Sequence, residues 1–416
     1  MVDYIERKKL IDTLSQYRNT PEIKVLTGVR RCGKSTLLSK YAELLHQSGV
    51  PDTNIFTKRF DSFDIPLGYN AQNLYDELAE AMQQAQPGSF YVFLDEIQEI
   101  PQWETIVRKL HTRPDTDVYI TGSNAWLLSG ELATYLTGRY VTIHVYPLSF
   151  AEYYAYRTSR SRSHSSESHG SIDQLFNQYM MFGGMPSLFA NGLPDERKAT
   201  ELLTAVYESV VMNDVAQRYG IRDITTLERL TQYLFSTSAN LFSTNNVLNT
   251  LRNAGVNTTY TTVDNQIGAL EKAFVLYSAR QERMRGKEIL RPQRKYYPVD
   301  NGLRNLATGF SGADRGAQLE GIVFMELIRR GYQVTIGTMP EGEIDFVARH
   351  NTDKQYIQVT LNMTEERTRQ RELAPLQRLQ DAFPRLVLTL DWFSEETTAE
   401  GIRIMNAIDW LRQSQD

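Results

Sequence analysis

The sequence predicts an α/β chain of several domains that begins with a doubly wound parallel sheet. Apolar stretches typical of strands alternate with helix-like stretches up to about residue 155. A glycine-containing turn from Gly28 to Thr36 follows the first of these strands, and Asp95 and Glu96 follow a later one. The length of 416 residues exceeds what one hydrophobic core usually serves, so two or three domains are expected.

The turn fits the pattern G-x-x-x-x-G-K-[ST] of a phosphate-binding loop (P-loop), between the apolar run Ile23 to Leu26 and a helix-like stretch from Thr36 to Leu45. Strand, turn and helix in this order aim backbone N–H groups and the positive end of the helix dipole at a phosphate. The lysine can reach the β- and γ-phosphates, and the serine hydroxyl can ligate Mg²⁺. We therefore predict a nucleotide-binding loop made of Gly28, Val29, Arg30, Arg31, Cys32, Gly33, Lys34, Ser35 and Thr36, with Lys34 also catalytic and Ser35 a metal ligand.

Two acids stand at the end of the apolar run from Phe90 to Leu94, which suits a strand buried on both faces of a parallel sheet. The carboxyl ends of such strands are where open α/β sheets bind ligands. We predict that Asp95 holds Mg²⁺ and that the catalytic Glu96 polarises the water that attacks the γ-phosphate. The alternative is that both acids only cap the following helix.

A third strand, Val118 to Thr121, ends in Gly122-Ser123-Asn124. Its polar side chains, Ser123 among them, lie where they could orient the same water, which makes Ser123 a catalytic candidate. Thr-Gly-Ser-Asn is also ordinary turn chemistry, so this prediction depends on the first two.

Composition narrows the class of protein. Apolar residues make up 41% and charged residues 23%, as in globular proteins, and the net charge of −5 gives no global bias toward nucleic acid. The single cysteine, Cys32, excludes an internal disulfide and suits the cytoplasm, and its place at a helix start favours a lowered thiol pKa. The charged start and the lack of an 18-residue apolar stretch predict a cytoplasmic protein without a membrane segment.

Five parts are expected along the chain. The sheet domain spans residues 1–155, and a serine-rich and basic stretch at 156–171 is too polar to pack a core, which predicts a mobile insertion. Phosphorylation or a partner contact at Ser163 to His169 is the less favoured alternative. Helical patterns over 172–224, broken at Gly183-Gly184, predict a lid or linker.

Residues 225–300 have the outline of a winged-helix domain, with three helices and a hairpin. The predicted helices are Leu227–Leu241, Asn245–Asn253 capped by Ser243, and Thr261–Phe274 capped by Thr258 or Thr259, and the hairpin strands are Phe274–Gln281 and Glu288–Val299. Between Arg280 and Lys295 seven bases face two acids, which favours contact with DNA phosphates. The DNA-binding candidates are Arg283, Arg285, Lys287, Arg291, Arg294 and Lys295. A solvated hairpin, or a contact with an acidic neighbouring subunit, remains an almost equal alternative.

Residues 301–416 predict an α/β domain of the restriction-endonuclease kind. We expect a helix at Leu319–Arg330 and strands at Tyr332–Ile336, Ile344–Ala348, Tyr356–Leu361 and Leu386–Leu390. Glu320, Glu343 and Asp345 stand at positions typical of metal-dependent nucleases. The later strand, however, reads Gln358-Val359-Thr360 where acid-x-lysine is required, and Lys354 lies in a turn, which argues against DNA cleavage.

The whole chain resembles the prokaryotic AAA-type ATPases, relatives of the archaeal ATPases, that carry a C-terminal domain of unassigned function. The matching stretches are Tyr4-Ile5-Glu6-Arg7, the P-loop, Phe93 to Gln98, Ile120 to Ser123, Leu136 to Tyr140, Pro147 to Glu152, Gly183 to Pro186, Glu343 to Val347 and Tyr356 to Val359. The resemblance implies an ATP-binding AAA+-type module, a winged-helix segment and an inactive nuclease-like fold. It also places Arg139 as a catalytic arginine finger or sensor, acting in cis or on a neighbouring subunit.

Two functional interpretations follow. In the first, an ATP-hydrolysing switch or motor couples nucleotide state to the binding of DNA or of a protein partner. In the second, an ATP-gated DNA-binding regulatory protein has negligible turnover; an ATP-controlled nuclease is a less favoured third. Because AAA-type sites often lie between subunits, we also expect a homo-oligomer.

Overall fold

The structure is a computed structural model that describes residues 4–123, 138–163, 171–189, 195–284, 293–310, 314–339, 342–392 and 395–413. Its contacts divide the chain into two compact units. The first comprises Met1–Tyr146 with Lys272–Phe274, and the second comprises Pro147–Glu271 with Val275–Asp416. The finer division into five parts stays a prediction.

The first unit contains a sheet of five parallel strands in the order β2-β3-β4-β1-β5. The strands are β1 (Ile23–Thr27), β2 (Ile55–Arg59), β3 (Phe90–Asp95), β4 (Thr116–Gly122) and β5 (Tyr140–His144). Every residue of β1 and β3 is buried, as the continuous apolar runs predict. The loop after β1 and the acids at the end of β3 therefore reach the same edge of the sheet.

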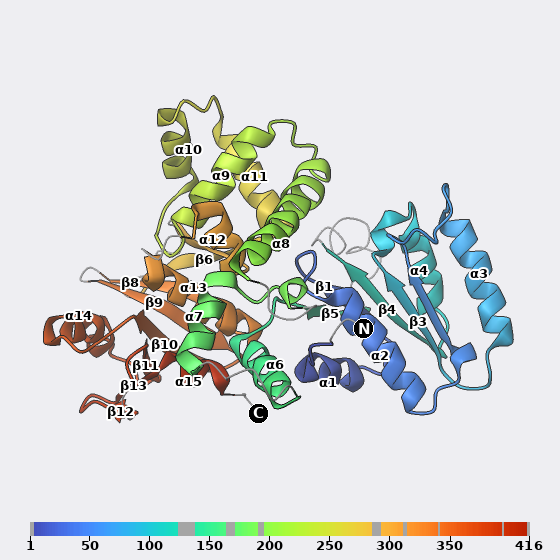
Figure 1. Cartoon of the computed structure of the whole chain (residues 1–416), viewed down its shortest axis with the longest axis horizontal. Coiled ribbons are helices and arrows are strands. Elements are labelled where there is room, and N and C mark those ends of the chain that lie inside the picture. Colours follow the sequence, from blue (N-terminus) through green and yellow to red (C-terminus); the bar gives the residue numbers. More distant parts are fainter. Residues whose placement is uncertain are drawn as a thin grey trace. The chain divides into compact units, whose positions relative to one another are not determined.

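Helices cover both faces of this sheet (Figure 1). On one face Tyr41 packs its ring against Phe93 and Tyr119, with ring centroids 6.4 and 5.4 Å away. On the other face Leu78 and Ile106 join the apolar side chains of alternate strand residues in one core. The predicted doubly wound parallel sheet is thus confirmed. Its helices are α1 (Lys8–Gln16), α2 (Lys34–Gln47), α3 (Ala71–Gln84) and α4 (Trp103–His111).

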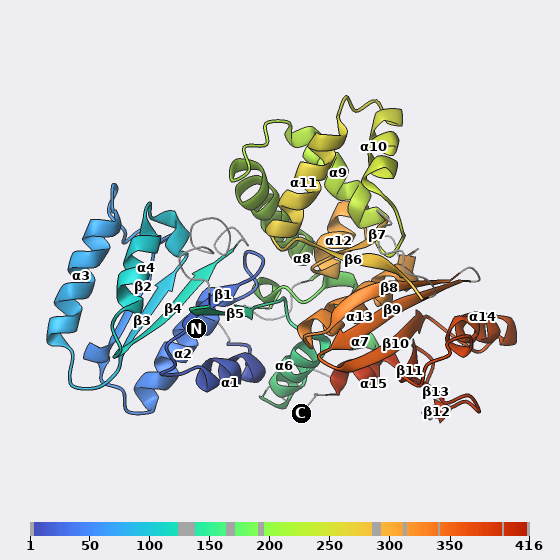
Figure 2. The same ribbon diagram turned by 180° about the vertical axis from the view of Figure 1, so that it is seen from behind.

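The second unit contains an eight-stranded mixed sheet in the order β12-β13-β11-β10-β9-β8-β6-β7. Its strands are β6 (Leu276–Arg283), β7 (Arg294–Pro298), β8 (Gln333–Met339), β9 (Gly342–His350), β10 (Asp353–Thr360), β11 (Arg385–Thr389), β12 (Glu396–Thr397) and β13 (Ile402–Asn406). The predicted hairpin exists as β6 and β7, but β6 also pairs in parallel with β8 (Figure 2). The hairpin is therefore part of the C-terminal sheet, whereas the sequence pattern had grouped it with the three preceding helices.

The helices of this unit are α6 (Phe150–Ser163), α7 (Ile172–Phe182), α8 (Glu196–Ser209), the π-helical η5 (Val210–Gln217), α9 (Ile224–Ser236), α10 (Thr244–Asn253), α11 (Tyr260–Lys272), α12 (Asn301–Thr308), α13 (Arg315–Arg329), α14 (Glu366–Gln377) and α15 (Ala407–Arg412). Helices α9 to α11 match the three predicted helices, and Ser243 caps α10 as predicted. Helix α6 runs to Ser163, so the first half of the predicted insertion is helical. The phosphorylation alternative falls mostly outside the described residues. Within the described ranges, no helix is both long and apolar enough to cross a lipid bilayer.

Candidate functional site

The P-loop connects β1 to α2, and its shape depends on glycine. Gly28 has φ +152°, and a Cβ atom there would lie 2.0 Å from the carbonyl oxygen of Val145. The Val145 N–H also donates to the Thr27 carbonyl at 2.7 Å, which fixes the base of the loop. Gly33, with φ +100°, is the N-cap of α2 and has no side chain to occupy the first N–H groups of the helix. These groups are therefore available to an anion.

The Lys34 ammonium is buried inside this loop. It donates to the carbonyl oxygens of Gly28 at 2.9 Å and Val29 at 3.2 Å, and it lies 4.0 Å from Glu96 Oε1. The structure thus brings together the predicted lysine of the P-loop and the predicted catalytic acid that follows β3, two residues far apart in the sequence. A cation and a carboxylate at this separation can face a phosphate and its attacking water from two sides.

Asp95 lies beside the first turn of α2. Its carboxylate accepts a hydrogen bond from Thr121 Oγ1 at 2.6 Å and contacts the hydroxyl of Ser35. Burial raises the pKa of Asp95, although the hydrogen bonds from Thr121 and Ser35 oppose that shift.

The residues present fit Mg²⁺, because a hydroxyl and a carboxylate are hard oxygen donors and Mg²⁺ needs only one or two protein ligands beside substrate phosphates. Among the described residues no group of three or more acids, histidines or cysteines could hold a metal by itself. A site that shares its ligands between Ser35, Asp95 and a triphosphate is compatible with that finding.

Thr121 belongs to the site and was missed by the sequence analysis. Its fully buried hydroxyl donates to Asp95 and accepts the Glu96 N–H at 2.9 Å, so one side chain positions both acids. Glu96 itself has a left-handed backbone, with φ +54°. The available signal was a polar residue next to the end of the apolar strand β4. Ser123, one residue beyond this strand, is buried.

The other loop residues differ in exposure. Arg31 is exposed with φ +65°, Thr36 is exposed, and Arg30 is half-buried. Cys32 is completely buried, and burial raises the pKa of its thiol, so the expected lowered pKa is wrong. Lys34 and Arg7 lower this pKa, but less than burial raises it.

Arg59, also missed, lies opposite Asp95 at the end of β2. Its Nε is 3.8 Å from Asp95 Oδ2 and 2.5 Å from Asp61 Oδ1, and its side chain is largely exposed. It adds a cation to the edge where the acids lie.

Arg139 lies where the parallel strands begin, whereas the P-loop lies where they end. It directly precedes β5, and the Ile23 N–H at the start of β1 donates to its carbonyl at 2.9 Å. The P-loop follows the other end of β1, five residues or about 16 Å away, which is more than an arginine side chain spans. Of the two alternatives, this position of Arg139 argues against action in cis, and action on a neighbouring subunit stays a prediction.

The DNA-binding candidates divide into three groups. Lys295 is 3% exposed and is paired with three carboxylates, so its predicted contact with DNA is wrong. Arg294 has a 35% exposed side chain, 3.9 Å from Glu271. Arg285, Lys287 and Arg291 lie outside the described residues, as does the side chain of Arg283.

The acids predicted from the C-terminal sequence converge on Lys295. Its Nζ is 2.9 Å from Glu320, 2.5 Å from Glu343 and 3.7 Å from Asp345. Burial alone would lower the pKa of Lys295, but the carboxylates raise it above its ordinary value. Gln358, which stands where the motif requires an acid, accepts the Asp345 N–H at 3.4 Å.

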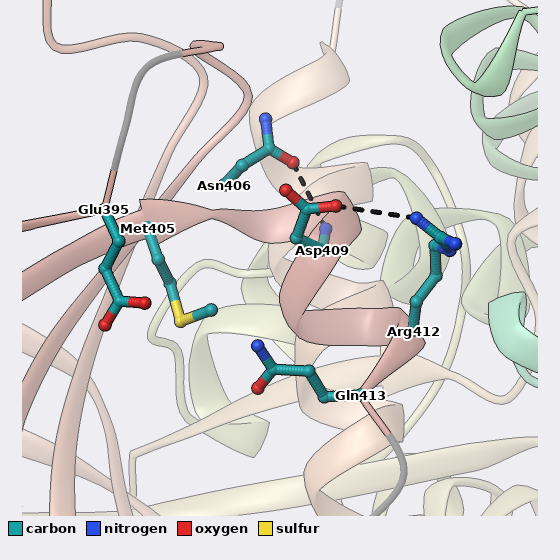
Figure 3. A pocket seen from close by; sticks show the side chains of 6 residues that line it. All are labelled: Glu395, Met405, Asn406, Asp409, Arg412 and Gln413. Atoms are coloured by element: carbon teal, nitrogen blue, oxygen red, sulfur yellow. Dashed lines mark hydrogen bonds and ion pairs between the residues drawn. The ribbon is translucent and has the colours of Figure 1, made fainter.

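A pocket of about 430 Å³ in the second unit is lined by other residues (Figure 3). Asn406 accepts the N–H groups of Ile408 and Asp409 and so caps α15, and Asp409 pairs with Arg412 at 3.6 Å. Because these polar side chains serve the helix and none is a predicted site residue, this pocket is no candidate for the chemistry.

Comparisons with known proteins agree with the site in the first unit. Residues 20–154 match the family described as AAA domain, and residues 173–314 match a domain of unknown function (DUF8612). The chain is 38% identical over 409 residues to an uncharacterized protein of Haemophilus influenzae, covering 98% of this chain and 99% of that protein. It is 27% identical over 376 residues to the uncharacterized protein MJ1544 of Methanocaldococcus jannaschii, covering 88% and 80% of the two chains.

Among solved structures, the Walker-type ATPase paby2304 of Pyrococcus abyssi superposes with a TM-score of 0.51 at 13% identity, over 73% of this chain and 96% of that one. At this identity the likeness concerns the fold alone. The expected AAA-type P-loop fold is confirmed, whereas the nuclease-like C-terminal part stays a prediction. The chain thus belongs to the same family as the Haemophilus influenzae protein, a family with an AAA domain near its amino end.

Proposed function

We propose that this protein binds ATP with Mg²⁺ and hydrolyses its γ-phosphate. The observation that carries the proposal is the meeting of Lys34 and Glu96, 4.0 Å apart, at the edge where the P-loop opens α2. A protein that only binds nucleotide needs the loop but has no need of a carboxylate held at this place.

Each side chain has a part in this reaction. Lys34 exchanges its two loop carbonyls for phosphate oxygens, and Ser35 and Asp95 hold Mg²⁺. When bound, Mg²⁺ neutralises charge on the β- and γ-phosphates. Glu96 takes a proton from the attacking water. Thr121 holds Glu96 and Asp95 in position through one hydrogen bond with each residue. Ser123, buried directly after β4, is a further polar residue proposed to orient the water.

We further propose that nucleotide state controls the binding of DNA or a protein partner by the second unit, in a cytoplasmic homo-oligomer. Support for DNA comes from the excess of bases between Arg280 and Arg294 in the sequence and from the exposure of Arg280 and, in part, Arg294. Helices α9 to α11 form the helical part of the proposed winged-helix region. The five-part division with boundaries at 155, 171, 224 and 300 belongs to this proposal, although β6 and β7 join the C-terminal sheet and α6 runs across residue 155.

Steady-state ATP hydrolysis tests the proposal, with and without DNA. Lys34→Ala is expected to lose nucleotide affinity, and Glu96→Gln to keep it while turnover falls about 100-fold, as for loss of a general base. Glu80→Gln, which changes an exposed acid on α3, is the matched control and is expected to behave as wild type.

Hydrolysis that survives Lys34→Ala would show that another protein supplies the activity. Wild-type protein whose DNA affinity responds to ATP without measurable turnover would instead favour the ATP-gated regulatory protein.

A further inference from the structure

We infer that Gln98 is a further catalytic residue, which holds the attacking water together with Glu96. This inference rests on the proposed hydrolysis of ATP. Gln98 lies in η2 (Ile97–Glu99), the short 3₁₀ turn that directly follows Glu96.

The Gln98 side chain turns back onto the acid. Its Nε2 donates to Glu96 Oε2 at 2.5 Å, while the other oxygen of Glu96 faces Lys34 at 4.0 Å. The two oxygens of the carboxylate are thus held by different neighbours, an amide and a cation. A carboxylate has no hydrogen to give, so the amide nitrogen must face it and the amide oxygen must point elsewhere.

The amide oxygen of Gln98 is the informative atom. Gln98 Oε1 is buried, and among the described residues it has no hydrogen-bond partner. A buried carbonyl oxygen without a donor is unfavourable, so such an atom beside a candidate general base indicates a partner that the protein itself does not supply. A water molecule, the second reactant of the proposed reaction, has the required O–H donor.

The turn that carries Gln98 is fixed to the body of the unit. Ile97 is completely buried in the core, and the Glu96 N–H is tied to the Thr121 hydroxyl. These contacts hold the backbone directly before Gln98, and the hydrogen bond to Glu96 orients its side chain, so a water bound to both needs little rearrangement before reaction.

The chemistry uses both O–H groups of that water. The Glu96 carboxylate accepts one O–H and the Gln98 carbonyl accepts the other, which leaves an oxygen lone pair to face the γ-phosphorus. The water oxygen forms a bond to phosphorus as the bond to the bridging oxygen breaks, and the electron pair of that bond stays on ADP. The water proton passes to Glu96, while Gln98 stays neutral.

Gln98→Leu tests the inference, because it removes both amide atoms at similar volume. The expected result is a fall in kcat of about 10- to 100-fold, with the dissociation constant of a fluorescent ATP analogue and the melting temperature unchanged. Gln72→Leu is the matched control, since Gln72 is an exposed glutamine whose amide donates only to Asp76 at 2.8 Å on α3.

The same change in a Glu96→Gln background separates a catalytic from a structural role. If Gln98 acts on the water that Glu96 deprotonates, Gln98→Leu should lower the residual single-turnover rate less than about threefold there. An equal loss in both backgrounds, or a loss accompanied by weaker nucleotide binding, would assign Gln98 to structure. Unchanged turnover of the Gln98→Leu variant would overturn the inference. Faster turnover would also overturn it, because it would show that the amide restrains Glu96.

The two proposals fail in different ways. Wild-type protein without ATP turnover overturns both, whereas active wild type with an equally active Gln98→Leu variant overturns only the role of Gln98.

Discussion

Asp300 shows how one buried carboxyl group organises the second unit. It is the N-cap of α12 and accepts the N–H groups of Gly184 at 2.7 Å, Gly302 at 2.9 Å and Leu303 at 3.3 Å. A Cβ atom on Gly183 would lie 2.0 Å from its Oδ1, so the Gly183-Gly184 turn is built around this carboxyl. Burial outweighs the three donors and raises the pKa of Asp300 from 3.8 to about 6.

This pKa shift makes stability depend on pH. Because the folded state binds the Asp300 proton more tightly than the unfolded state, the contribution of this group is complete below pH 4 and is lost as pH rises through about 6. The loss amounts to about 3 kcal/mol at 1.36 kcal/mol per pH unit. Urea unfolding at pH 4 to 7 should show wild type losing this advantage relative to Asp300→Asn. Parallel curves for the two proteins would contradict the assignment, and Asp264→Asn, at an exposed position, is the control.

At the scale of elements, Lys295 connects three of them. It extends from β7 to Glu320 on α13 and to Glu343 and Asp345 on β9, and the Tyr297 hydroxyl of β7 donates to Glu320 at 2.7 Å. The pKa of Asp345 is raised well above its usual range, chiefly by burial and by the neighbouring Glu320. The positive charge of the Lys295 ammonium therefore offsets the repulsion between these neighbouring carboxylates.

Lys295→Met should destabilise the second unit by about 3 to 5 kcal/mol, because it leaves buried carboxylates without their cation. Part of the loss should be recovered as pH falls, since a protonated Asp345 no longer needs a cation. Urea unfolding followed by circular dichroism measures both effects. Lys198→Met, on the exposed surface of α8, should change stability by less than about 0.5 kcal/mol, and an equally small change at Lys295 would contradict the role of the cluster.

The same elements show what sequence patterns can predict. Helices α9 to α11 and strands β8 to β11 follow from local periodicity and caps, because those signals lie within each segment. The pairing of β6 with β8 joins segments far apart in the chain and leaves no local signal. Successive side chains of a strand point to opposite faces, so Arg294 on β7 is partly exposed while its neighbour Lys295 is buried. A count of charges along the sequence does not separate these two faces.

The candidate site likewise contains residues that could be predicted from the sequence and residues that could not. The P-loop was predictable because its residues are consecutive, and Asp95 and Glu96 were predictable because parallel strands end at one edge. Thr121 contacts both acids and Gln98 contacts Glu96 through individual hydrogen bonds, and no spacing rule marks such contacts. The pKa of Cys32 depends on complete burial, which a helix-start argument does not include.

At the scale of the whole molecule, Arg139 raises the question of assembly. It is exposed and lies at the far edge of the sheet from the P-loop of its own chain. An arginine that stabilises charge on the γ-phosphate can then act only on the site of another copy. A protein that uses it must be an oligomer while it hydrolyses ATP.

Mixing two inactive variants tests this prediction. Arg139→Ala keeps its P-loop and Lys34→Ala keeps its arginine, so each should be inactive alone, whereas in a mixed oligomer the second supplies Arg139 to the site of the first. With random assembly, about a quarter of the interfaces combine an intact site with an intact arginine, so turnover should return to about a quarter of wild type. Arg113→Ala, at an exposed arginine of the same unit, should stay active alone. No gain on mixing, or a monomeric mass at micromolar concentration with a non-hydrolysable ATP analogue, would remove Arg139 from the mechanism, because its own P-loop is beyond its reach.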